Sequence, residues 1–223
     1  LHPVAHSFPT RRSSDLEGCG VCSLVCDIKA INSEPAVNGQ WYISKTRFGP
    51  MSHARLGVAE ENSGKLVTLV KHNKDRIARQ ANLNQSIIDG SPGTGCPVIA
   101  SITGANYALI VTEPTVSGVH DLKRILDVTN YFKVRSGVIV NKYDINLVKT
   151  EEIKLLSNKN NSKFLGVIPY DKIITEAQVK GLSVIEFSKN EISQKIYEIW
   201  KKVQIECNID KNLENYSESY NHL

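Results

Sequence analysis

The sequence is short of several features that would place it in a specialised class of protein. Its five cysteines among 223 residues are too few for a disulfide framework, and their usage favours a reducing, cytoplasmic location. The formal net charge is only +4, so no strong basic excess points to nucleic-acid binding. Apolar runs between residues 99 and 111 are interrupted by Gly104 and Asn106 and are too short to span a membrane.

The segment 89–97, DGSPGTGCP, follows directly after the apolar run 86–88. An apolar strand that ends in Asp and enters a Gly-rich turn can present a carboxylate to Mg²⁺ and glycine amides to a phosphate. Asp89 is a hard oxygen ligand suited to Mg²⁺ held through water, and Gly93 lets the backbone approach an anion. Taken alone, the segment is equally consistent with an ordinary strand-to-loop turn.

Two further apolar runs, 137–140 and 164–168, also end in polar or Pro-containing loops. The first is followed by Asn141 and Asp144, whose side chains can hydrogen-bond a purine edge, and the second by Pro169. In an open parallel sheet, ligands bind beyond the carboxyl ends of the strands. The sequence therefore predicts an α/β fold in which the candidate residues meet at one edge.

Helices are expected between these strands. Apolar residues at helical spacing predict a helix over 119–132 with Ser117 as its N-cap, and another over 192–203. Nearer the N-terminus, 41–43 reads as a strand and 51–80 as mostly helical.

Cys19, Cys22 and Cys26 have the spacing of the last part of a C-x₂-C-x₂-C-x₃-C run, which ligates 4Fe–4S clusters in bacterial ferredoxins. The first cysteine of that run would fall at position 16, where this chain has Leu16, and Asp27 stands where Pro is usual. Zinc is the competing interpretation, because C-x₂-C also suits tetrahedral Zn²⁺. The third cysteine, with no matching His or Cys pair downstream, favours iron and sulfur.

The order of the motifs IIDGSPGTGCP, VTEPT, VIVNKYD and LGVIPYD resembles the MinD/ParA-type P-loop ATPases, in particular the branch with an inserted ferredoxin-like 4Fe–4S module. The resemblance implies a mostly parallel P-loop NTPase sheet flanked by helices, with ATP, Mg²⁺ and a 4Fe–4S cluster as cofactors. It also implies a homodimer whose conformation switches on nucleotide hydrolysis.

The resemblance further assigns roles to residues of the loops. Asp89 would hold the Mg²⁺ water shell, and Gly93 would sense the γ-phosphate in a loop that reorders on hydrolysis. Asn141 and the backbone of Pro169 would contact the base. Glu113, in the TEPT segment, would line the nucleotide site, although a plain strand-to-helix turn is an equal alternative.

The motifs do not decide whether the nucleotide base is adenine or guanine. Residues 141–144 read N-K-x-D, the form typical of guanine readers, in which Asp144 would pair with guanine. The resemblance instead implies ATP, with Asn141 reading adenine and Asp144 turned away. A GTP-specific relative is therefore the alternative to an ATP-dependent protein.

Cys96 lies shortly after Asp89, at the separation that the nitrogenase iron protein, a member of the same superfamily, uses for a cluster ligand. Such a site needs a second cysteine on the main domain, and none lies upstream there. We therefore expect Cys96 to be a buried structural thiol.

The nucleotide loop of the family, GKGGxGKT, has no counterpart in this sequence. Residues 7–16, SFPTRRSSDL, resemble a translated sequencing adapter, so 1–16 is expected to be a non-native leader and the chain a fragment. We expect 17–50 to be the remnant of the ferredoxin-like module, 51–206 the C-terminal part of the nucleotide-binding domain, and 207–223 a polar tail. The intact parent is expected to be an ATPase and the fragment to be inactive.

The functional expectation is an iron–sulfur, ATP-dependent switch protein of the MinD type that acts on a redox or cluster-client protein. We expect neither a nucleic-acid partner nor a membrane span. The alternative is a non-catalytic electron carrier or cluster scaffold in which the domain only binds nucleotide.

Overall fold

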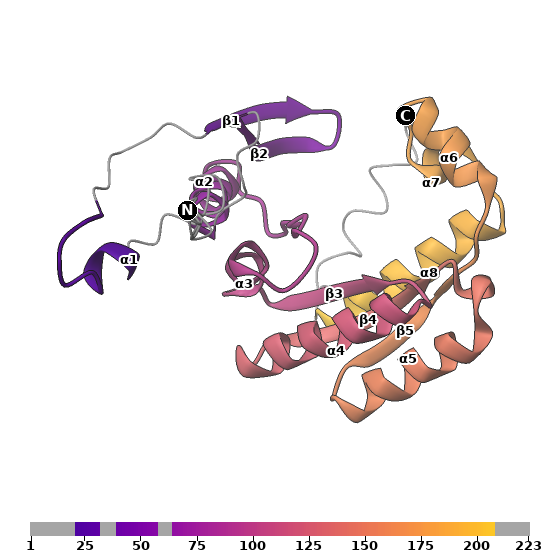
Figure 1. Ribbon diagram of the computed structural model, residues 1–223. Coiled ribbons are helices and arrows are strands. Elements are labelled where there is room, and N and C mark those ends of the chain that lie inside the picture. The colour runs from indigo at the N-terminus through magenta and orange to yellow at the C-terminus, as the bar shows by residue number, and fades with distance from the viewer. Residues whose placement is uncertain (1–20, 32–38, 58–63, 208–223) are drawn as a thin grey trace, which may run out of the picture. The chain divides into compact units, whose positions relative to one another are not determined.

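The computed structural model describes residues 21–31, 39–57 and 64–207, and the chain divides into two compact units after Ser101 (Figure 1). The first unit contains α1 (Val21–Leu24), β1 (Gly39–Thr46), β2 (Gly49–Leu56), α2 (Gly64–Gln80) and all but the last residue of α3 (Cys96–Ile102). The second contains β3 (Tyr107–Thr112), α4 (Val116–Tyr131), β4 (Arg135–Asn141), the 3₁₀ helix η2 (Tyr143–Ile145), α5 (Leu147–Lys159), β5 (Lys163–Ile168), α6 (Lys172–Val179), α7 (Val184–Phe187) and α8 (Glu191–Glu206).

In the first unit, β1 and β2 form an antiparallel hairpin, which confirms the strand predicted at 41–43. Tyr42 lies directly opposite His53 and stacks on its ring, with the ring centroids 5.3 Å apart. The prediction of helix from residue 51 is wrong for 51–56, because cross-strand pairs of this kind stabilise the extended conformation that β2 adopts. The hairpin continues past residue 50, and the proposed division of domains there stays a prediction.

The strand predicted at 86–88 is not formed in the structure. This segment has no regular secondary structure, and the side chain of Ile87 is 83% exposed. A strand is stable only as part of a hydrogen-bonded ladder, because its backbone N–H and C=O groups need partners. Among the described residues, the sheets are the hairpin and the β3–β4–β5 sheet, and neither includes this segment.

The second unit is built on a parallel sheet in the order β3-β4-β5. Helix α4 connects β3 to β4 and α5 connects β4 to β5, and these two helices pack together on one face (Figure 1). Helix α8 packs against β5 on the other face. The predicted α/β class, with a parallel sheet flanked by helices, is confirmed.

The central strand β4 is buried on both faces. Val138 and Val140 pack with Leu122 and Leu126 of α4, whereas Ile139, which points the other way, packs with Ile199 of α8. This alternation follows from the two-residue period of a strand, and parallel strands covered by helices are apolar on both sides. The sheet therefore has two cores, one beneath each helical layer.

The predicted helices at 119–132 and 192–203 are confirmed as α4 and α8. Each buries one apolar stripe against the sheet and leaves a charged face exposed, as expected for helices on the surface of a domain. No helix in the described ranges is both long enough and apolar enough to cross a bilayer.

Gly137, in β4, allows the close approach of two side chains from its neighbouring strands. A Cβ at this position would lie 2.2 Å from the hydroxyl oxygen of Tyr107 and 2.6 Å from Cδ1 of Leu165. The Tyr107 hydroxyl is buried and has no hydrogen-bond partner among the described residues. Burial, and then the charge of Glu206, raises the pKa of Tyr107 to about 12, so this phenol stays neutral.

We predict that Gly137→Ala destabilises the protein by about 2 kcal/mol, because the added methyl group overpacks the sheet against Tyr107 and Leu165. Tyr107→Phe, in contrast, should change the free energy of unfolding by less than about 0.5 kcal/mol, since it removes a buried hydroxyl that makes no hydrogen bond. Urea unfolding followed by circular dichroism measures both. A large loss of stability in Tyr107→Phe would show that the hydroxyl has a partner.

Candidate functional site

The candidate site of the second unit lies at the carboxyl edge of the parallel sheet. Strands β3, β4 and β5 run in the same direction, so their last residues lie along one edge. Glu113 follows β3, Asn141 is the last residue of β4, and Pro169 follows β5. The structure therefore brings together three of the residues that the sequence singled out, and a ligand at this edge would meet all three loops.

An ion pair joins the ends of β3 and β4. The Lys142 Nζ lies 2.7 Å from the Glu113 Oε1, and the two side chains are 38% and 41% exposed. An ion pair with this exposure contributes little to stability, typically less than about 1 kcal/mol. Its effect is geometric, because it holds the β3–α4 turn beside the residue that follows Asn141.

Lys142 also has an uncommon backbone conformation, with φ 53° and ψ 44°, in the left-handed region. The other non-glycine residues with positive φ in the described parts follow helices or lie in turns, whereas Lys142 directly follows a strand. This conformation turns the chain sharply after Asn141 into η2. It places the polar residues of N-K-x-D beyond the sheet rather than along it.

A second contact joins the ends of β4 and β5. The Asp144 Oδ1 accepts a hydrogen bond of 2.8 Å from the backbone N–H of Tyr170. The carboxylate thus ties the loop after Pro169 to η2. Hydrogen bonds to a charged acceptor are stronger than neutral ones, even where water can compete.

The helices that follow these loops begin at capped positions. The side chain of Asn146 accepts the N–H of Lys149 at the start of α5, and the side chain of Asp171 accepts that of Ile173 at the start of α6. Thr150 donates its hydroxyl to the carbonyl of Tyr143. These contacts fix the backbone on both sides of η2 without involving Asn141.

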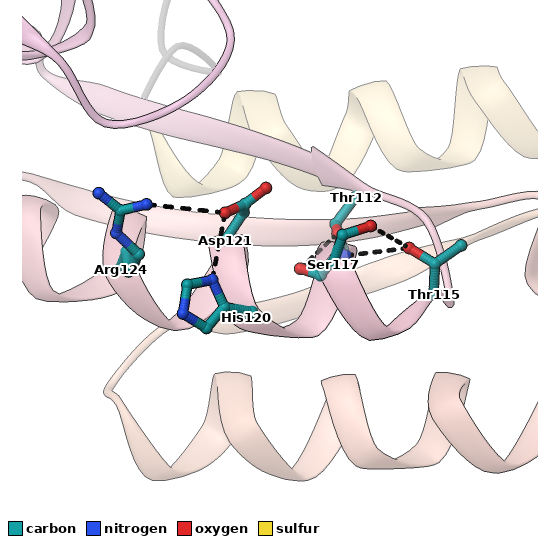
Figure 2. A network of polar contacts seen from close by, with 7 residues as sticks. Thr112, Thr115, Ser117, His120, Asp121 and Arg124 are labelled. Carbon is teal, nitrogen blue, oxygen red and sulfur yellow. Dashed lines mark hydrogen bonds and ion pairs between the residues drawn. The ribbon is translucent and has the colours of Figure 1, made fainter.

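The β3–α4 turn is built around Thr115 and Gly118, as Figure 2 shows for Thr115. The Thr115 hydroxyl accepts the N–H of Gly118 at 2.9 Å, so Thr115 is the N-cap of α4. The prediction of Ser117 as N-cap is wrong, because Ser117 lies inside the helix, which starts earlier, at Val116. The Thr112 hydroxyl donates to the carbonyl of Gly118 and closes the turn.

Gly118 is required by the close packing of this turn. A Cβ at Gly118 would lie only 2.2 Å from the carbonyl oxygen of Glu113. Farther along α4, His120 and Arg124 both lie beside the exposed carboxylate of Asp121, at 3.4 and 4.0 Å (Figure 2). This group is on the solvent-exposed surface of the helix and takes no part in the turn.

Asp89 and Gly93 lie in the loop before α3, in the first unit. Both residues are exposed, and Asp89 lines a cavity of about 430 Å³ that β2 and α2 also border. Gly93 has φ 87°, a conformation that side chains rarely adopt, and a Cβ there would meet no atom within 4 Å. The expected convergence of Asp89 and Gly93 with Asn141 stays a prediction, since Asn141 belongs to the second unit.

The cysteine segment is described from residue 21 onward, and Cys19 lies outside the described residues. Cys22 is exposed on α1, and the partly exposed sulfur of Cys26 accepts the backbone N–H of Ala30 at 3.3 Å. The iron–sulfur interpretation of these cysteines stays a prediction. In the described ranges, no three Cys, His, Asp or Glu residues lie close enough together to hold a metal ion.

The expectation of a buried thiol at Cys96 is wrong, because Cys96 is exposed at the start of α3. The helix begins there, and its first residue faces away from the core that Val98 joins two residues later. Cys207 at the end of α8 is partly buried, and this burial raises the pKa of its thiol.

Sequence reasoning missed three groups that shape the candidate site. Lys142, which pairs with Glu113, was read only as the second residue of N-K-x-D. Thr115, the N-cap of α4, was not considered as a cap. Tyr170 contributes its backbone N–H, which no pattern of side chains can predict. The Pro114–Thr115 pair just before a helical stripe was a usable signal for Thr115, because Thr is a common N-cap.

Comparison with known proteins identifies relatives without an established function. No family model matches the chain. It is 30% identical over 216 residues to the uncharacterized protein MJ0578 of Methanocaldococcus jannaschii, with 86% of this chain and 73% of that protein covered. It is also 30% identical over 182 residues to the uncharacterized protein MJ0579 of the same organism, covering 82% of this chain and 60% of that protein.

Among solved structures, the chain is similar to the MinD cell division protein of Aquifex aeolicus, with a TM-score of 0.53 and 19% identity over 73% of this chain and 68% of that one. It is also similar to MinD of Pyrococcus horikoshii in complex with Mg-ADP, with a TM-score of 0.50, 18% identity, and 63% and 56% of the two chains covered. At this level of identity, the similarity shows a shared fold.

We predict that Thr115→Ala lowers the free energy of unfolding by about 1 kcal/mol, because the N–H of Gly118 loses its acceptor. Ser117→Ala is the comparison variant: it removes only the exposed contact of the Ser117 hydroxyl with the Thr115 hydroxyl, 3.1 Å away, and should change the free energy of unfolding by less than about 0.5 kcal/mol. Thermal and urea unfolding measure both variants. Equal losses, or a larger loss in Ser117→Ala, would contradict the assignment of the cap.

Proposed function

This chain belongs to the same family as the Methanocaldococcus jannaschii protein MJ0578, and we propose that it is an ATP-dependent switch protein with an iron–sulfur module. The observation that carries the nucleotide part of the proposal is the carboxyl edge of a MinD-like sheet, where two contacts between loops hold the residues that follow Asn141 and Pro169. A similar protein, MinD of Pyrococcus horikoshii, was solved with Mg-ADP, which supports a nucleotide with Mg²⁺ as the ligand here.

The base is proposed to be adenine. To read guanine, a carboxylate needs one oxygen for N1–H and the other for the exocyclic amine. The Asp144 Oδ1 already accepts the N–H of Tyr170, so the carboxylate is oriented toward the protein backbone. Asn141 then provides the amide for the base, and the backbone of Pro169, held in place through Tyr170, provides the second contact.

Asp89 and Gly93 are proposed to serve the phosphate end. The exposed carboxylate of Asp89 would bind the water shell of Mg²⁺, a mode that suits this ion because it dehydrates reluctantly. The left-handed backbone and open surroundings of Gly93 would let its N–H approach a γ-phosphate. Catalysis at such a site consists mainly of positioning and charge stabilisation.

Glu113 is proposed to act indirectly. Its carboxylate pairs with Lys142, so it orients the loop that carries Asn141 rather than contacting the nucleotide. Glu113 was expected to contact the nucleotide directly; in this role it acts on the nucleotide site only through its ion pair with Lys142. It explains why a carboxylate is tolerated at an edge that binds an anion, since the lysine neutralises its charge.

The cysteines are proposed to bind 4Fe–4S clusters, with Cys19 and Cys22 serving one cluster and Cys26 a second. The N–H of Ala30 on the sulfur of Cys26 supports a ligand role, because such hydrogen bonds tune cluster potentials. A cluster would supply one-electron chemistry. In this proposal, a homodimer transfers the electron or the cluster to a client protein. The similar MinD protein of Aquifex aeolicus was solved in a complex with MinC.

We predict that this chain binds ATP more tightly than GTP. Because the sequence has no GKGGxGKT loop, binding should be weak, and ligand-observed NMR competition is the suitable measurement. Asp144→Asn keeps an oxygen acceptor for the Tyr170 N–H and should retain the ATP affinity, whereas Asp144→Ala should lose roughly tenfold. Tighter binding of GTP, abolished in Asp144→Asn, would overturn the adenine assignment.

Cys19, Cys22 and Cys26 do not complete a cluster site by themselves, so this prediction concerns the intact parent protein. We predict that its anaerobic reconstitution with iron and sulfide gives the broad visible absorption of iron–sulfur clusters. Cys22→Ser and Cys26→Ser should each lower the bound iron and acid-labile sulfide, because each removes a thiolate ligand. Cys207→Ser is the control and should leave both unchanged, since Cys207 lies at the end of α8. Stoichiometric zinc with no iron would favour the zinc interpretation instead.

A further inference from the structure

A lysine of helix α2 caps the C-terminus of helix α3. The Lys71 Nζ donates hydrogen bonds to the carbonyl oxygens of Ala100 and Ser101, at 2.7 and 3.1 Å. The last carbonyls of a helix have no partner within the helix and carry its partial negative charge. A single ammonium group therefore satisfies two of these carbonyls and fixes the end of α3.

The environment of Lys71 shows that this contact has a cost. Burial, and then the charge of Lys74, lowers the pKa of Lys71, while Asp75 opposes the shift. A lysine in such a place gives up part of its hydration, and the two carbonyls replace the lost water. An uncharged side chain of the same length would fill the space without this cost, so what the ammonium group adds here is its two hydrogen bonds.

Helix α3 is attached to the loop that contains Asp89 and Gly93. The carbonyl of Gly95 accepts the N–H of Val98 at 3.0 Å, so the end of the loop is the first turn of α3. At the start of the loop, a Cβ on Gly90 would lie 3.8 Å from the Cβ of Ser101, at ordinary contact distance. Both ends of the loop thus follow the position of α3.

On its other side, α2 is attached to the β1–β2 hairpin. The Ser52 hydroxyl of β2 donates to the carbonyl of Val70 at 3.0 Å, one residue before Lys71. The N-terminal end of α2 also touches α3, because a Cβ on Gly64 would lie 3.0 Å from the carbonyl oxygen of Cys96. Helix α2 therefore contacts α3 at two points and the hairpin between them.

A cavity of about 430 Å³ lies between the loop and the hairpin. It is lined by residues of β2, α2 and the loop, including His53, Lys71 and Asp89. One connection between the loop and β2 therefore runs along the border of this cavity, through the hydrogen bonds of Ser52 and Lys71.

We propose that Lys71 is a positioning residue that couples the Asp89–Gly95 loop, through α3 and α2, to the β1–β2 hairpin. A shift of the loop moves α3. The movement of α3 is transmitted to α2 through the hydrogen bonds of Lys71, and from α2 to the hairpin through the hydrogen bond of Ser52. That such a shift follows the nucleotide state rests on the proposed function. The coupling itself is a property of the first unit and is measurable without nucleotide or iron.

Hydrogen–deuterium exchange of the intact chain tests the coupling. Lys71→Met keeps the apolar stem and removes the donors, and it should speed exchange roughly tenfold in α3 and also in β2. Lys71→Arg keeps donors for the carbonyls and should restore most of the protection. Lys74→Met is the control, because Lys74 lines the same cavity but pairs with Asp75, and it should leave α3 unchanged.

The reverse direction distinguishes coupling from local support. Ser52→Ala, on the hairpin, should speed exchange in α3 and raise the rate at which the exposed Cys96 thiol reacts with a disulfide reagent. Combined with Lys71→Met, it should add little, since both variants break one path. Additive effects, or changes confined to the element that carries each mutation, would overturn the proposal. ATP binding measured on the same variants tests the proposed function separately.

Discussion

The second unit depends on one constraint, the burial of β4 on both faces and its pairing on both edges. Val138 and Val140 face the helices on one side and Ile139 faces α8 on the other, so the middle of the strand, from Ser136 to Val140, is buried. Its neighbours must then be parallel strands that reach it through the helices α4 and α5. The polar loops that follow the three strands consequently lie at one edge of the sheet. The candidate site is formed by these loops.

At that edge, charged side chains hold backbone loops in place. The pair of Glu113 and Lys142 and the hydrogen bond from Tyr170 to Asp144 each contribute little to stability because both are open to solvent. Together they connect the ends of all three strands. In the first unit, Lys71 likewise holds a backbone segment with a charged group, because its ammonium binds carbonyl oxygens at the end of α3. In both units, a charged side chain holds a loop that contains candidate site residues, or the helix attached to it.

The sequence predicted most of the sheet and its helices, because their apolar periodicity is local information. It failed where the outcome depends on a partner. Residues 86–88 have a strand-like pattern but no ladder to join, whereas 51–56 lie opposite β1 and form a strand that the pattern did not suggest. Ser117 and Thr115 are equally good caps by type, and only the start of α4 decides between them. Cys96 was expected inside and lies at the surface.

By itself, the sequence determined the fold class, the order of the motifs and the residue types in each loop, since these follow from composition and periodicity along the chain. Only the tertiary structure decided what those residues contact. Asp144 accepts a backbone N–H from the next loop, and Glu113 pairs with the lysine that follows the next strand. The physical reason is that hydrogen bonds and ion pairs depend on distances of a few ångströms between segments remote in sequence, which no local pattern specifies.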